Sequence, residues 1–97
     1  MTSKIVRFQI GAGISMREVT GTLHLARLAA ESLYGEERVE LEVNCWADES
    51  ERVVHVETDS EVGRTLAIVF AGYARREFGD GAVRMERSVE PEVAGAV

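Results

Sequence analysis

The chain has 97 residues, of which 45% are hydrophobic and 29% are charged, and this balance is typical of one small globular domain. A net charge of −6 opposes binding to phosphate backbones, so we expect no nucleic-acid partner. No segment has the ~20 apolar residues of a membrane span, no signal-peptide core is evident, and Cys45 has no disulfide partner. We therefore expect a cytoplasmic protein without a membrane partner. Arginine outnumbers lysine ten to one, which indicates a GC-rich and, we infer, bacterial genome.

The first half of the chain predicts a strand, a helix and a second strand. Residues 4–10 alternate apolar and polar side chains, as a half-buried strand does. Ser15 and Glu18 have the spacing of a capping box, and the apolar stripe after them predicts a helix over 16–34, ended by a glycine. Alternation resumes after that glycine and predicts a strand over 39–44.

The second half predicts the same succession. Alternation over 52–57 indicates a third strand. Thr58 and Glu61 form a second candidate capping box, which opens another amphipathic helix that again ends at a glycine. A last short strand begins at residue 83, and residues 89–97 are expected to form a flexible tail.

The two halves also resemble each other in sequence. Residues 15–23 align with residues 58–66 at an offset of 43, with four identical positions. The predicted order is β-α-β-β-α-β, built from halves over about 4–46 and 52–88 within one domain, 1–88. Two right-handed βαβ units side by side predict an α+β, ferredoxin-like sandwich: a four-stranded antiparallel sheet in the order 4-1-3-2, with both helices on one face.

The loop between the first strand and the first helix is a candidate ligand site. Gly11 and Gly13 allow close approach of a ligand, and the amides after them lie at a helix N-terminus, which attracts anions. Ser15 and Arg17 would complete a site for a small anionic ligand. The alternative is that the two glycines only form a tight turn.

The segment Gly13–Arg17 is similar to the Gly-Val-x-Phe-Arg segment of acylphosphatases, although Ala12 stands where that family has a glutamine. The resemblance implies an acyl-phosphate hydrolase. In such an enzyme the loop would cradle the phosphate, Arg17 would bind it, and Asn44 would orient the attacking water.

The outer side of the second helix is the leading candidate for an interface. Ile68 lies among charged residues on the side opposite the apolar stripe, and Gly72 comes one turn later. A glycine in the middle of a helix costs ~1 kcal/mol of stability relative to alanine. Its presence at position 72 therefore suggests that another backbone approaches the helix there. With Arg64 and Arg75, these residues would contact a protein partner or a second copy; alternatively, Ile68 is a solitary surface residue.

The open face of the sheet is the other candidate surface. We expect it to carry arginines on its first and last strands and glutamates on its two others, as in a sheet-to-sheet dimer or a merely solvated face. Its predicted members are Arg7, Gln9, Glu40, Glu42, Val53, His55, Glu57, Arg84 and Glu86. No aromatic residue is expected on its two central strands, which argues against RNA. No spacing indicates a metal, a cofactor or a nucleophile with its base, so a non-enzymatic interaction module is the favoured function.

Overall fold

The computed structural model describes residues 3–90, which form three helices and one four-stranded sheet. In chain order the elements are β1 (Ser3–Ile10), α1 (Met16–Tyr34), α2 (Glu36–Glu42), β2 (Cys45–Asp48), β3 (Val53–Glu57), α3 (Glu61–Phe78) and β4 (Val83–Glu90). All neighbouring strands are antiparallel, in the order β2-β3-β1-β4, which reads 4-1-3-2 from the β4 edge. The predicted α+β class and the four-stranded antiparallel sheet are confirmed.

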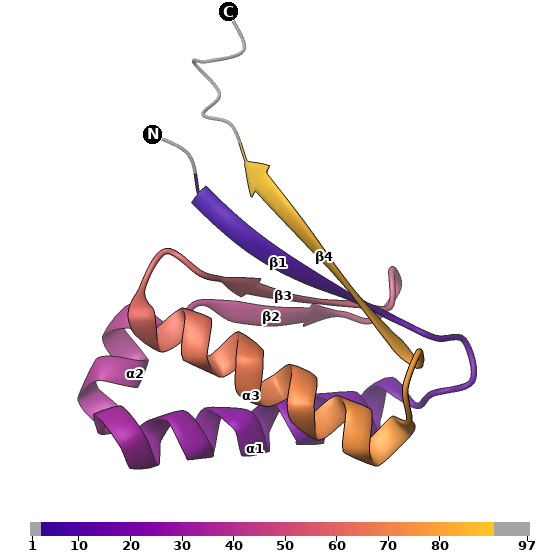
Figure 1. Cartoon of the computed structure of the whole chain (residues 1–97), viewed down its shortest axis with the longest axis horizontal. Helices are drawn as coiled ribbons and strands as arrows, with labels where there is room; N and C mark the ends of the chain where they lie inside the picture. Colours follow the sequence, from indigo (N-terminus) through magenta and orange to yellow (C-terminus); the bar gives the residue numbers. More distant parts are fainter. Residues whose placement is uncertain (1–2, 91–97) are drawn as a thin grey trace, which may run out of the picture.

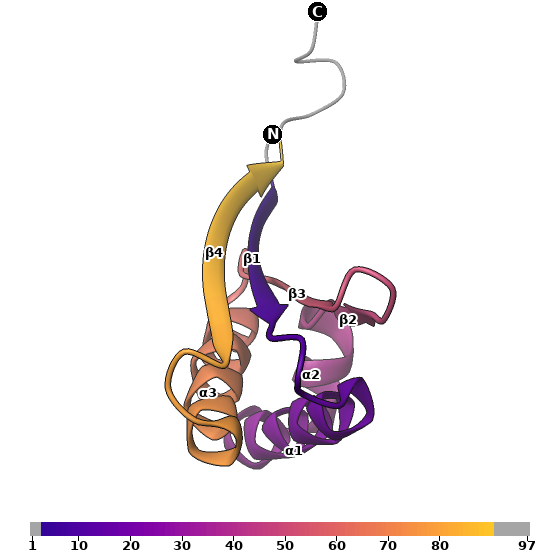
Figure 2. The ribbon, with the colours of Figure 1, turned by 90° about the vertical axis from the view of Figure 1, so that its right-hand side faces the viewer.

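The helices form a layer on one face of the sheet, and the opposite face is open (Figures 1 and 2). The core lies between the two layers, where alternate strand residues meet the inner rows of the helices. It includes Val6, Phe8, Ile10, Val54 and Val56 from the sheet, and Val19, Leu23, Val62, Leu66 and Phe70 from the helices. The rings of Phe8 and Phe70 meet edge to face at 4.9 Å, which fixes α3 against β1.

The predicted strand over 39–44 is wrong, because this segment forms most of α2 and the second strand begins only at Cys45. Helical winding buries Val39 completely and leaves Leu41 82% exposed. Arg38 donates two hydrogen bonds to Glu42 one turn away, and these hold the pKa of that carboxyl below its usual range. The described residues, 3–90, therefore contain three helices instead of the predicted two.

The predicted capping box at Thr58 is also displaced. The amide of Thr58 donates to the Lys4 carbonyl at 2.8 Å, and an Asp59 carboxylate oxygen accepts from the Lys4 amide at 3.1 Å. Because these two residues continue the contact with β1, α3 begins later, and Ser60 is its N-cap. The Ser60 hydroxyl accepts from the Gly63 amide at 2.9 Å.

The similarity of the two halves extends through the glycine that ends each long helix. Gly35 has φ 91° and Gly79 has φ 95°, and each donates its amide to a carbonyl four residues back. Beyond these glycines the halves diverge, since the first leads into α2 and the second into β4. β4 continues to Glu90, and residues 91–97 of the predicted tail lie outside the described residues.

Gly63 tests the packing of α3 on the sheet. A methyl group there would overlap the backbone carbonyl oxygen of Glu57, whereas one at Gly21 of α1 would meet open space. Gly63→Ala should lower the free energy of unfolding by about 1–3 kcal/mol through overpacking. Gly21→Ala should raise it by about 0.5–1 kcal/mol through helix propensity. Urea unfolding followed by circular dichroism measures both, and equal effects of the two substitutions would contradict this packing.

Candidate functional site

A groove of about 710 Å³ runs between α3, the N-terminal half of β1 and the facing part of β4. Figure 2 shows the reason, since these two strands curve away from the helix layer toward the chain termini. The groove is lined by Lys4, Ile5, Val6, Thr58, Arg64, Ala67, Ile68, Ala71, Gly72, Arg75, Met85 and Arg87. Its volume is within the range of ordinary binding clefts.

All four predicted interface residues line this groove. Arg64, Ile68 and Gly72 occur at intervals of four, so they form one row along α3, and Arg75 extends the patch. Ile68 is 72% exposed. A methyl group at Gly72 would have no neighbour within 4 Å, so packing within residues 3–90 does not require a glycine there.

The opposite wall comes from β1 and β4, and the residues of this wall were not among the predicted site residues. Met85 is 51% exposed, because β4 lies at the edge of the sheet and curves away from the helix layer (Figure 2). Arg87 lies two residues further on, on the same side of β4, and Lys4 lies at the start of β1. Alternation along the last strand could have placed Met85 and Arg87 together. Their distance from Ile68 depended on the tertiary fold.

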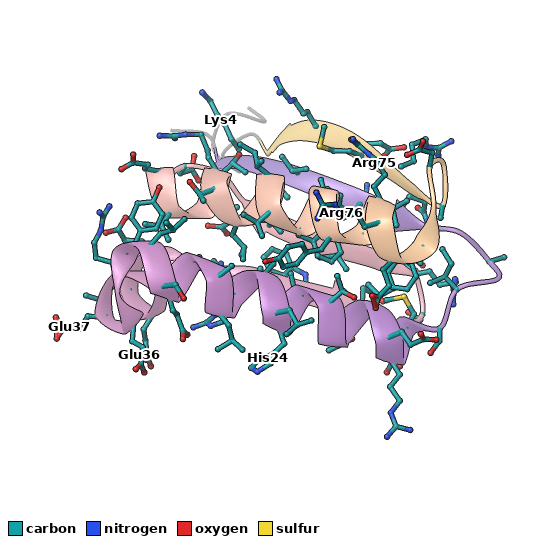
Figure 3. All side chains as sticks on the ribbon, turned by 60° about the horizontal axis from the view of Figure 1, so that its bottom comes forward. Lys4, His24, Glu36, Glu37, Arg75 and Arg76 are labelled. Carbon is teal, nitrogen blue, oxygen red and sulfur yellow. The ribbon has the colours of Figure 1, made fainter. Side chains whose placement is uncertain are left out.

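The groove is basic although the whole chain is acidic. Its lining contains Lys4, Arg64, Arg75 and Arg87 but no carboxylate. Arg75 pairs with Asp80 at 3.6 Å, and both side chains are largely exposed, so this ion pair is weak. The other three cations have no ion pair within the described part of the chain. Lys4 and Arg75 lie on the same side of the molecule in Figure 3.

The Gly11–Arg17 loop uses its polar backbone groups internally. The Gly11 amide donates to the Ala82 carbonyl at 2.9 Å, and the Ile14 amide donates to the Gly11 carbonyl at 3.1 Å. The Arg52 guanidinium donates to the carbonyls of Gly11, at 2.6 Å, and of Ile14. A methyl group at Gly11 would lie 3.1 Å from the Ala82 oxygen, so a close backbone approach explains this glycine. These bonds leave fewer donors for an anion than the sequence suggested.

The structure does not bring together the residues of the acylphosphatase resemblance. Ser15 caps α1 by accepting from the Glu18 amide, and Arg17 is exposed in the first turn. Asn44 precedes β2 and hydrogen-bonds the Glu57 carboxylate at 2.8 Å, next to the Glu57–Ile5 register pair. The loop adjoins the other end of β1, about 17 Å from Ile5 at ~3.4 Å per residue. Asn44 therefore cannot orient a water molecule at Arg17.

The open face of the sheet also differs from its prediction. Glu40 and Glu42 lie in α2, so the expected acidic strand is absent from the face. Trp46 of β2 takes its place, 41% exposed and stacked on His55 with ring centroids 4.8 Å apart. The separation of charge on which a sheet-to-sheet dimer would depend is therefore lost.

No protein-family model matches the chain, and no curated protein is significantly similar to it. Within residues 3–90, no cluster of three or more histidine, cysteine, aspartate or glutamate side chains could hold a metal ion. No helix of that described segment is long and apolar enough to cross a membrane. The groove is therefore the feature on which a functional argument can be built.

Arg52 anchors the Gly11–Arg17 loop from outside it. No feature of the sequence indicated this contact, because only the fold brings Arg52 beside Gly11. Hydrogen bonds to charged groups contribute about 1.5–3 kcal/mol, so Arg52→Ala should lower the free energy of unfolding by about that much. Arg52 also has φ 57°, so Arg52→Gly should retain ~1 kcal/mol more than Arg52→Ala. Urea unfolding of both variants measures the two effects. Wild-type stability in Arg52→Ala would contradict the anchoring role.

Cys45 is the single thiol of the chain, on the side of β2 that packs against the core. Burial raises the pKa of this thiol, and the nearby Arg27 guanidinium offsets part of the rise. At about pH 8, close to the ordinary thiol pKa, we expect iodoacetamide to alkylate the folded protein more slowly than the protein in concentrated urea. Equal alkylation rates would show that the thiol is not protected.

Proposed function

We propose that this chain is a non-enzymatic interaction module whose α3 groove binds an apolar protein segment flanked by acidic residues. The observation that carries the proposal is the composition of the groove. An apolar surface formed by Ile68, Ala71 and Met85 is bordered by cations and contains no carboxylate. Apolar burial would supply affinity, while the rim charges would select an acidic partner and speed its association.

The chemistry of the groove favours a protein segment over a small anion. A small anion would use only the charged groups of the groove, whereas the lining also offers the apolar side chains of Ile68, Ala71 and Met85. The exposed Ile68 can pack against an apolar side chain of a protein partner, and Gly72 one turn later leaves room for the backbone of that partner. The anion-binding alternative at the Gly11–Arg17 loop has less support, because Arg52 and Ala82 engage that backbone.

We further propose that the architecture is a variant of the ferredoxin-like sandwich. The sheet order and the position of α1 and α3 on one face support it. The variation is α2, which replaces most of the predicted second strand. This helix leaves β2 only four residues long.

A peptide selection tests the interaction function. The full chain is used to select binders from a displayed library of random peptides, and one selected peptide is labelled with fluorescein. We expect apolar residues flanked by Asp or Glu in the selected sequences. Ile68→Glu should weaken binding of the labelled peptide at least about tenfold, because it places a carboxylate at the centre of an apolar contact.

Two further variants control this experiment. Gly72→Leu fills the groove without a change of charge and should also weaken binding. Leu25→Glu changes an exposed leucine on α1, outside the groove, and should leave the affinity unchanged. If no selected peptide depends on Ile68, or if Leu25→Glu has the same effect as Ile68→Glu, the groove is not the binding site.

A further inference from the structure

The α2 end of the molecule has the chemistry that the groove would select. Leu41 is the most exposed of the large apolar side chains in residues 3–90. Glu40 precedes it, and Glu37 lies one helical turn before it. Neither carboxylate, nor that of Glu36, has an ion pair in the part of the chain that the structure describes. We call this surface, formed by Glu36, Glu37, Glu40 and Leu41, the α2 knob.

The α2 knob is held rigidly, so it cannot move to the groove of its own chain. Val39 is fully buried in the core, and the Ser60 hydroxyl donates to the Glu42 carbonyl at 3.1 Å. Figure 3 shows Glu36 and Glu37 pointing outward at one end of the molecule, away from the side that carries Lys4 and Arg75. A contact between knob and groove therefore requires two molecules.

We propose that the α2 knob of one copy occupies the α3 groove of a second copy, so that copies join head to tail. This inference rests on the proposed function, because it names the occupant of the same groove. Leu41 would lie against the apolar surface around Ile68, and the glutamates would face Lys4, Arg64 and Arg87. None of these cations has an ion pair within the described residues, and Arg64 donates only to the backbone carbonyls of Thr58 and Asp59. Rigid surfaces on both sides limit the conformational entropy lost on binding.

Charge complementarity favours this pairing over a symmetric one. Two grooves face to face would bring eight cations together and would repel each other. Knob and groove are different surfaces, so their contact is heterologous and leaves a free knob and a free groove at the two ends. The α2 knob consists of only four residues, so we expect a small contact area and weak association that grows with protein concentration.

Two single substitutions, measured by sedimentation velocity on the full chain, test the pairing. Wild-type protein should show a mass that rises with concentration. Ile68→Glu blocks the groove and leaves the knob intact, whereas Leu41→Ser removes the apolar contact of the knob and leaves the groove intact. Each should weaken association at least about tenfold, the equivalent of one buried leucine. Both positions are exposed, and circular dichroism verifies that the variants are folded.

An equal mixture of the two variants gives the decisive result. The intact knob of Ile68→Glu can fill the intact groove of Leu41→Ser, but no further copy can add, so dimers should form without larger species. Leu25→Glu should associate as the wild type does. Added salt should weaken wild-type association, since opposite charges meet at the rim.

The outcomes separate this inference from the function on which it rests. A monomeric wild type at every concentration, a mixture that stays monomeric, or association that strengthens with salt would each overturn the head-to-tail pairing. If selected peptides still bind in an Ile68-dependent way, the interaction function stands and the partner is another protein. If peptide binding fails as well, both proposals fall.

Discussion

The contact between Phe8 and Phe70 is the constraint on which the groove depends. It joins the centre of α3 to β1 beyond the middle of the strand, and Leu66 and Ala74, four residues before and after Phe70, are fully buried as well. Toward the chain termini, β1 and β4 stay paired with each other but leave the helix layer, in keeping with the twist of the sheet. The groove is the space that opens between a helix held at its centre and a strand pair that continues past it.

Charge is distributed unevenly over this small acidic protein. The groove gathers four of its eleven basic residues, while α2 gathers four glutamates within seven residues. One of these glutamates is neutralised by Arg38, and the others face solvent. Because of this separation, the electrostatic potential at the groove differs in sign from the net charge of −6. The groove can therefore attract acidic groups although the whole chain is acidic.

The helical part of the candidate site was predictable and its strand wall was not. Arg64, Ile68, Gly72 and Arg75 share one side of α3 because helical periodicity projects nearby residues onto a common row. Lys4 and Arg87 join them only through the pairing of β1 with β4, which links residues at opposite ends of the chain. In the Gly11–Arg17 loop, likewise, only the fold shows that Arg52 and Ala82 engage the backbone of Gly11.

The sequence by itself determined the class of fold, the glycines that end both long helices and the rows of apolar residues that form the core. These features depend on local preferences, such as the positive φ angles of Gly35 and Gly79. Only the tertiary structure decided which element each of these glycines leads into. The alternating residues that follow each glycine predicted a strand in both places. The first segment also carries helix-forming glutamates and the Arg38–Glu42 spacing, and it forms α2, in which Val39 is buried. The segment after Gly79 lies beside β1 and pairs with it as β4, because a strand is stabilised by its neighbours.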